Sequence, residues 1–193
     1  MQGMQVRFVG GLAILILLVL HAFAKSLPQM LWACHVATLA IALGVLAERP
    51  RLIAAGTLFH AGSGIPTYIL GVLTSGENSV TSVLVHTVPI TVGLLELWRL
   101  GMPRGAILPG WLLYIGAMVV SYFVTPPSMN INLVHEPWPP MASVFTQPWM
   151  SWVGNGIMTL VLLAAADRAI RAWFARRHRR RGAAAAEVTE LAA

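Results

Sequence analysis

The chain has very little charge for its length. Of its 193 residues only 10% are Asp, Glu, Lys or Arg, whereas 57% are hydrophobic. A soluble domain of this size cannot stay monodisperse with so few charged side chains, so the sequence predicts an integral membrane protein. The hydrophobic runs are continuous, about 20 residues long, and do not alternate with polar residues, which excludes a β-barrel and favours α-helices.

Cysteine is almost absent as well. The single cysteine, Cys34, excludes an internal disulfide and any metal site built from cysteine alone. Most of the net charge of +6 comes from the run RAWFARRHRRR at residues 171–181. Because this run directly follows a hydrophobic helix, we interpret it as a cytoplasmic anchor that contacts anionic lipid headgroups, and not as a nucleic-acid-binding segment.

Six hydrophobic runs are long enough to cross about 30 Å of hydrocarbon at about 1.5 Å of helical rise per residue. The arginines that flank these runs all fall on one side of the predicted membrane, which by the positive-inside rule is the cytoplasmic side. The sequence therefore predicts an all-α, polytopic membrane helical bundle of six transmembrane helices in the cell membrane, with the N- and C-termini cytoplasmic and residues 125–149 extracytoplasmic. The runs cover residues 6–24, 28–47, 51–74, 79–98, 105–125 and 148–170.

One structural unit is expected. Residues 1–174 are predicted to form a single transmembrane helical bundle, and residues 175–193 a basic and then Ala/Glu-rich cytoplasmic tail that is disordered or a frayed helix. The first run also resembles a signal peptide, because Arg7 precedes a short apolar stretch and the tripeptide AFA precedes Lys25. Cleavage there would leave five spans and would not alter the rest.

Several ionisable side chains lie inside the predicted spans. Helical rise places Cys34 and His35 on the second span, and His86 on the fourth, at a similar depth of roughly 10 Å below the outer surface. His21 lies about one turn from the outer end of the first span, and His60 lies nearer the midplane of the third. Such groups are costly in a membrane and normally face the protein interior or a water-filled cavity, so each is a functional candidate. The alternative is that each histidine is only a hydrogen-bonding strut between helices, and the cysteine a small inert side chain.

The third span contains the sequence HAGSGIPTY at residues 60–68. Ser63 and Pro66 lie within this run, where the proline frees a backbone carbonyl and the glycines allow a close approach by a neighbouring helix or a ligand. The run therefore predicts a kink. This kink either widens a cavity beside His60 and His86 or serves only for close packing of small residues.

The long outer loop, residues 125–149, is rich in proline and carries tryptophans at the expected membrane interface. These residues predict a stiff lid that lies on the membrane. His135 and Glu136 at its centre could reach the mouth of a cavity.

Three motifs in this order resemble a known family. They are LWACHVATL around Cys34, VLVHTVPITVGLLEL around His86, and SMNINLVHEPWPP in the outer loop. Together they resemble the androgen-induced-gene superfamily of small multispanning intramembrane enzymes, which includes fatty-ester hydrolases with a Thr–His pair, acyltransferases with a Cys–His pair, and related bacterial integral membrane proteins. The resemblance covers about residues 28–170, and the chain departs from it in having His35 directly after the cysteine and in lacking a Gly-Thr-Asn-Tyr-like run in the loop.

The resemblance implies an intramembrane lipid-directed hydrolase or acyltransferase that acts on membrane lipids without a cofactor or metal. Cys34 would be the nucleophile and His86 the base, because a free thiol is mostly protonated and a histidine within hydrogen-bond reach produces thiolate on demand. Asn132 or Asn130 would donate to the oxyanion. The other predicted substrate-binding residues are His35, His60, Ser63, Pro66 and His135.

Two other interpretations stay open. His35 and His86 could hold a b-type haem between them, or His21, His35, His86 and His135 could bind copper together with Cys34. Alternatively, the protein is a non-catalytic accessory subunit or a small transporter in which the histidines are struts between helices.

Overall fold

The computed structural model describes residues 2–76 and 79–191, and every regular element in those ranges is helical. This confirms the predicted all-α class. Short 3-10 turns lie in the connections. The α-helices are α1 (Gln2–Ala24), α2 (Ala33–Leu46), α3 (Pro50–Phe59), α4 (Ile65–Ser75), α5 (Val80–Leu100), α6 (Ile107–Val124) and α7 (Pro148–Leu191).

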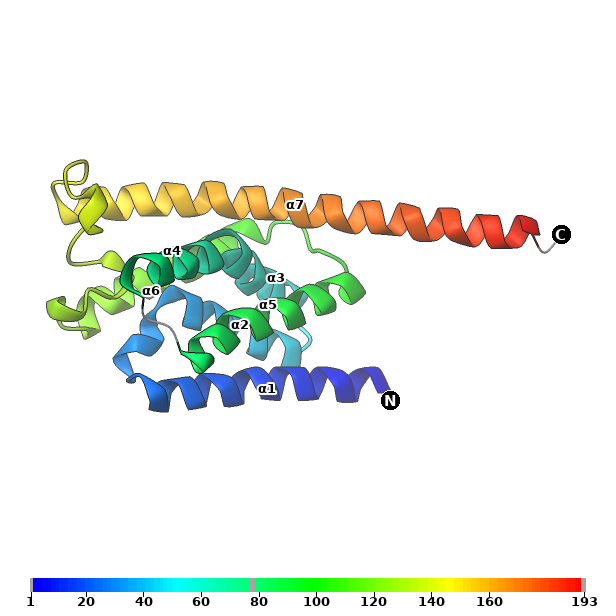
Figure 1. Ribbon diagram of the computed structural model, residues 1–193, viewed down its shortest axis with the longest axis horizontal. Helices are drawn as coiled ribbons and strands as arrows, with labels where there is room; N and C mark the ends of the chain where they lie inside the picture. Colours follow the sequence, from blue (N-terminus) through cyan, green and yellow to red (C-terminus); the bar gives the residue numbers. More distant parts are fainter. Residues whose placement is uncertain (1, 77–78, 192–193) are drawn as a thin grey trace.

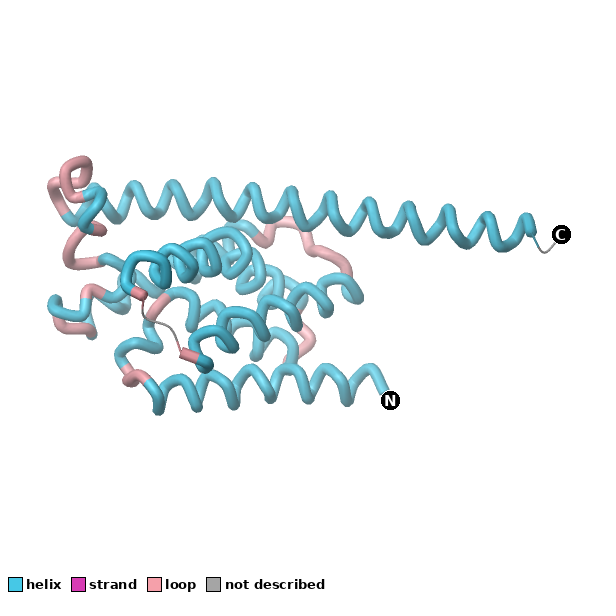
Figure 2. The backbone as a smooth tube through the Cα atoms, in the orientation of Figure 1, coloured by secondary structure: helices cyan, strands magenta, loops and turns pink. Residues whose placement is uncertain are grey.

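The helices run roughly along the long axis of the molecule, with α1 along one edge and α7 along the opposite edge (Figure 1). The chain reverses direction after α1, α2, α4, α5 and α6, so that the start of α1 and the end of α7 point to the same end (Figure 2). At that end Arg7 of α1 forms an ion pair of 2.6 Å with Glu48, which follows α2. We call this end, with the loops that follow α2 and α5, the arginine end.

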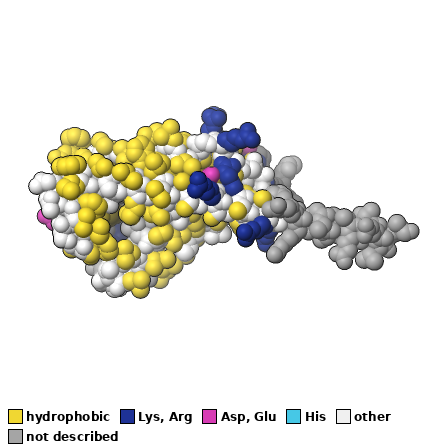
Figure 3. Space-filling view, turned by 90° about the horizontal axis from the view of Figure 1, so that it is seen from above, with side chains coloured by type: hydrophobic (Ala, Val, Ile, Leu, Met, Phe, Trp, Pro, Cys, Tyr) yellow, Lys and Arg dark blue, Asp and Glu magenta, His cyan; other side chains and the backbone are white. Residues whose placement is uncertain are grey.

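Four helical segments are long and apolar enough to cross a membrane: Arg7–Ala24, Val80–Leu100, Ile107–Val124 and Pro148–Arg177. Large hydrophobic side chains lie on the outside of these helices, and Phe123, for example, is 78% exposed. Hydrophobic side chains cover much of the face shown in Figure 3, whereas the basic side chains seen on this face, drawn in dark blue, gather toward the arginine end. A length of apolar helix with an apolar exterior indicates a multi-pass membrane protein.

Helical segments occupy all six hydrophobic runs of the sequence, and the residues between the runs end them for identifiable reasons. Pro50 opens α3, where its missing N–H has no intrahelical partner to lose. Ser79 caps α5 by accepting a hydrogen bond from the backbone N–H of Ser82. Gly76 ends α4 in the left-handed conformation that glycine adopts without steric cost.

The third hydrophobic run is helical throughout but changes its register at η2 (His60–Gly64), a π-helical turn between α3 and α4. The backbone N–H of Ile65 bonds to the carbonyl of His60, five residues earlier. Pro66 has no backbone N–H, so an α-helical turn at this point would lack one hydrogen bond. The π-helical pattern, with bonds between residues five apart, accommodates this gap. At Gly62 this turn packs so closely on α7 that an added Cβ would lie 2.7 Å from the carbonyl oxygen of Leu162.

For the tail, residues 175–193, the sequence leaves disorder and a frayed helix open, and the part that the structure describes is helical. There α7 continues without a break to Leu191. Alanine, arginine and glutamate are strong helix formers, and extending an existing helix requires no new nucleation. Residues 192 and 193 lie outside the described residues.

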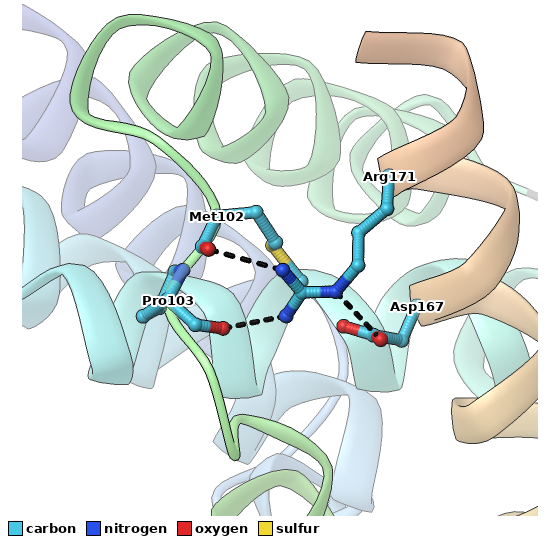
Figure 4. A network of polar contacts seen from close by, with 4 residues as sticks. All are labelled: Met102, Pro103, Asp167 and Arg171. Carbon is cyan, nitrogen blue, oxygen red and sulfur yellow. Dashed lines mark hydrogen bonds and ion pairs between the residues drawn. The ribbon is translucent and has the colours of Figure 1, made fainter. Parts of the chain in front are cut away.

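An arginine joins α7 to the loop between α5 and α6 (Figure 4). Arg171 donates to Asp167 Oδ2 at 2.8 Å, to the carbonyl of Met102 at 3.1 Å and to the carbonyl of Pro103 at 2.6 Å. Each of its three guanidinium nitrogens therefore has an acceptor, while Asp167 Oδ1 is buried without one in the described structure. We call this group the Arg171 clamp.

Candidate functional site

Four histidines from four helical elements meet away from the arginine end. They are His21 on α1, His35 on α2, His60 on η2 and His86 on α5, and all are buried, with at most 6% of each exposed. The ring centres of His21 and His35 are 4.8 Å apart, those of His35 and His86 are 6.0 Å apart, and those of His60 and His86 are 5.9 Å apart. The π-helical turn carries one member and the other three lie near helix ends, so packing of the whole bundle builds the cluster.

Backbone carbonyls fix the orientation of two of these rings. His35 Nδ1 lies 2.9 Å from the carbonyl of Gln29, and His86 Nδ1 lies 2.8 Å from the carbonyl of Ser82. A carbonyl can only accept, so in both rings Nδ1 carries the hydrogen and Nε2 keeps its lone pair in the neutral form. Tyr68 stacks on His86 with ring centres 4.1 Å apart. Both rings therefore present a basic nitrogen with a defined direction.

Two imidazole nitrogens of the cluster are buried and have no hydrogen-bond partner in the described residues: His35 Nε2 and His60 Nδ1. A buried polar atom without a partner costs roughly 1–3 kcal/mol. Native proteins rarely keep such atoms without a reason, and a reactive or ligand-binding role is one of the recognised reasons. The cluster thus combines four titratable rings with two unused nitrogens.

Thr38 contacts the other nitrogen of His60. Thr38 Oγ1 and His60 Nε2 are 2.7 Å apart, and both residues are fully buried. Thr38 Oγ1 also lies 3.2 Å from the carbonyl of Val85. If the hydroxyl donates its one hydrogen to Val85, His60 Nε2 must be the donor to Thr38, and the unpartnered Nδ1 then holds a lone pair.

Gly64 lies close to both Cys34 and this unpartnered nitrogen. A Cβ built on Gly64 would be 3.2 Å from His60 Nδ1 and 3.7 Å from Cys34 Cβ, so these two atoms are at most about 7 Å apart and no Gly64 side chain stands between them. Cys34 and Thr38 are about one helical turn apart on α2, and His60 and Gly64 are nearly one turn apart on η2. The first pair therefore faces the second across the contact between α2 and η2. Cys34 is half-buried and is a free thiol.

The predicted pair of Cys34 and His86 has no hydrogen bond between its members in the described structure, so it stays a prediction. The structure instead adds residues that the sequence analysis missed: Thr38 next to His60, Tyr68 on His86, and Thr81, whose Oγ1 is 3.0 Å from His21 Nδ1. Thr38 could have been noticed, because it follows Cys34 by four residues on one helix face. No pattern in the sequence identifies the other two.

Asn132 has a structural role in this conformation. Its Oδ1 accepts from the backbone N–H of Ala33 at 2.8 Å, and its Nδ2 donates to the carbonyl of Leu31 at 2.8 Å and to Ser121 Oγ at 2.9 Å. Both amide hydrogens are therefore used, and none is free for an oxyanion. The side chain ties the outer loop to the first turn of α2, directly before Cys34.

Asn130 likewise holds the loop together. Its Oδ1 accepts from the backbone N–H groups of His135 and Glu136, both at 3.0 Å, and its Nδ2 donates to the carbonyl of Glu136. His135 borders a separate groove of about 380 Å³, whose other lining residues are Tyr122, Val134, Pro148, Trp149 and Trp152.

The two remaining candidate residues, both in the third hydrophobic run, differ in their burial. Ser63 is buried within η2, whereas Pro66 is exposed on the outside of α4. The structure thus gathers His35 and His60 around His86 and Cys34, and it places Pro66 on the outer surface.

Within the described ranges, no group of three or more His, Cys, Asp and Glu side chains has the geometry to hold a metal ion. The fold and the site define a multi-pass α-helical membrane protein with a buried histidine cluster. No protein-family model matches the chain, and comparisons with curated proteins and with solved structures gave no match.

Proposed function

We propose that the protein is a six-span membrane enzyme, a hydrolase or acyltransferase of lipid esters, in which Cys34 is the nucleophile and the histidine cluster supplies the base. The observation that carries the proposal is that His60 Nδ1, which has no hydrogen-bond partner in the described structure, lies within about 7 Å of Cys34 Cβ. A nucleophile with a base beside it, and a third group that orients the base, is the usual arrangement for covalent acyl transfer. Thr38 is the orienting group here.

Six crossings are supported by the alternating direction of the helices and by the position of both chain ends (Figure 1). In this topology the arginine end is cytoplasmic, in agreement with the positive-inside rule. The packing of α1 against α2 and α5, and the place of His21 in the cluster, favour a first span that is retained.

The proposed chemistry begins when His60 Nδ1 takes the thiol proton of Cys34. The thiolate attacks the ester carbonyl carbon, the bond between that carbon and the alcohol oxygen breaks, and the leaving alcohol takes the proton back. Water or a second alcohol then attacks the acyl-cysteine while His60 Nδ1 takes its proton, the thiolate leaves, and the proton returns to the thiolate. The ring of His86 lies edge-on to that of His60, with ring centres 5.9 Å apart, and no hydrogen bond between them is found in the described structure.

The test is to trap the acyl-enzyme. The purified protein is incubated with a lipid-soluble thioester that carries an alkyne-tagged acyl chain, and the modified residue is identified by peptide mass spectrometry. The tag should be found on Cys34, should disappear in Cys34→Ala, and should persist in the control His135→Gln, which changes a histidine outside the cluster. A wild-type protein that stays unmodified, or that is modified equally after Cys34→Ala, would contradict the proposal.

The orientation of His35 and His86 favours one second candidate, a haem-binding redox module. Histidines that hold an iron or another metal commonly donate their second nitrogen to a backbone carbonyl, as both do here. A haem would supply one-electron chemistry between these two rings. Visible absorbance of the purified protein in the Soret region, lost in His35→Ala, would support this candidate, while acylation of Cys34 supports the first.

A further inference from the structure

A groove lies between α5 and α7 near the arginine end, distant in the fold from the histidine cluster. Its volume is about 340 Å³. It opens to the outside of the bundle, since Leu95 is 64% exposed and Trp173 is 44% exposed. The lining residues are Thr91, Leu94, Leu95, Trp98, Trp173 and Arg177.

Arg177 closes this groove at its arginine end. Its guanidinium carbon lies 5.7 Å from the ring centre of Trp98 and 5.7 Å from that of Trp173. The two indoles therefore hold the guanidinium in place through cation–π contacts, which leave the N–H groups at its edge free to bind an anion. In the described part of the chain no carboxylate pairs with Arg177, in contrast to Arg99 and Arg171, which pair with Glu96 and Asp167.

The groove continues away from this charge along the apolar surface of α5. From Trp98 back to Thr91 it follows two turns of helix, or roughly 10 Å of rise. Leu94 and Leu95 line this part, and among the described side chains no charged one does. A fixed cation at the end of an apolar, outward-facing groove on a membrane helix is complementary to an anionic headgroup with an attached acyl chain.

We propose that this groove binds one anionic phospholipid, with its phosphate on Arg177 and the upper part of one acyl chain along Leu94 and Leu95. The site is separate from the chemistry proposed for Cys34 and does not depend on it. Two features distinguish it from general attraction to the basic tail: a single oriented guanidinium between two indoles, and a bordering groove for the chain.

Native mass spectrometry of the full-length, delipidated protein tests this site. Phosphatidylglycerol and phosphatidylcholine with identical acyl chains are titrated separately, and the affinity of the first bound lipid is measured. The wild type should prefer phosphatidylglycerol, and Arg177→Gln should weaken that binding by about tenfold, since a charged hydrogen bond is lost. The matched control is Arg176→Gln, which removes the same charge from the neighbouring exposed position of α7 and should change the affinity less than twofold.

Three outcomes would overturn the proposal. Equal losses in Arg177→Gln and Arg176→Gln would mean that only the net charge of the tail matters. Equal binding of phosphatidylcholine would remove the role of the anionic headgroup. Displacement of the lipid by free glycerol phosphate at a similar concentration would show an anion site in which the groove has no part. Filling the groove by Thr91→Trp should weaken lipid binding while binding of free glycerol phosphate stays as it is in the wild type.

Discussion

The two ends of the bundle treat their buried polar groups differently. In the Arg171 clamp every guanidinium nitrogen donates to an acceptor, which links α7 firmly to the loop between α5 and α6, and one carboxylate oxygen of Asp167 is left without a partner. In the histidine cluster, His35 and His60 each keep one buried nitrogen without a partner in the described structure. Each unused group raises the free energy of the folded state, and a reactive or ligand-binding role is one recognised reason for keeping it. The comparison therefore makes the histidine cluster the stronger candidate for chemistry, because two of its ring nitrogens are unpartnered while the guanidinium of the clamp is fully bonded.

Replacing His60 with glutamine should have the largest effect, and it should fall on activity. If His60 is the base for Cys34, His60→Gln should reduce the rate of Cys34 acylation by about 10²–10⁴-fold, the usual contribution of general base catalysis. The measurement is the rate of thioester labelling, with His135→Gln as the control. An unchanged rate would transfer the role of base to another ring, and His86→Gln should then show the loss instead.

The second prediction concerns how a structural residue can be recognised: by hydrogen bonds to all of its polar atoms, and not by its position in the bundle. Asn132 lies at the same end as the histidines, but all of its amide groups are bonded. Asn132→Ala leaves the Ala33 N–H and the Leu31 carbonyl without partners and should lower the free energy of unfolding by about 3 kcal/mol. The measurement is unfolding by SDS in mixed micelles. Ser128→Ala, at an exposed position of the same loop, should cost less than about 1 kcal/mol, and equal effects would contradict this assignment.

The third prediction breaks the clamp itself. Arg171→Gln should lower the free energy of unfolding by about 2 kcal/mol, because two carbonyls and Asp167 lose a charged donor. The value is modest because the arginine side chain is 35% exposed and solvent screens its charge. Arg168→Gln changes an exposed arginine on the same helix and should stay within about 0.5 kcal/mol of the wild type. A larger loss in Arg168→Gln than in Arg171→Gln would show that helix charge, and not the clamp, is responsible.

The sequence was sufficient to predict the helices, because hydrophobic length and the residues that end helices are both local properties. It also predicted that His35 and His86 lie at a similar depth, since depth follows from helical rise alone. It did not predict which faces of the helices meet. The contact of Thr38 with His60 depends on the rotation of α2 and η2 about their axes, which only packing determines.

Two other differences have the same origin. The resemblance implied an oxyanion role for Asn132 or Asn130, while the amide of Asn132 is bonded to Leu31 and Ser121. These partners are far from it in the chain, so no local pattern shows that they meet. For the tail, composition left disorder and a frayed helix open, and its connection to α7 lets the helix continue to Leu191. In both cases the missing information is non-local: a tertiary contact for the asparagine, and an existing helix for the tail.

The smallest expected effect on the free energy of unfolding is also the most direct test of the comparison. The double variant Thr38→Val, His60→Leu removes the bond between these side chains and also the unpartnered Nδ1. Replacing both partners of a buried hydrogen bond with apolar groups of similar shape is often nearly neutral, and here it also removes an unsatisfied atom. The free energy of unfolding should therefore change by less than about 1 kcal/mol, or increase, while labelling of Cys34 falls as in His60→Gln. A loss of about 3 kcal/mol, as for Asn132→Ala, would contradict this expectation, because it would show that His60 is a strut between helices and that its free nitrogen has no other use.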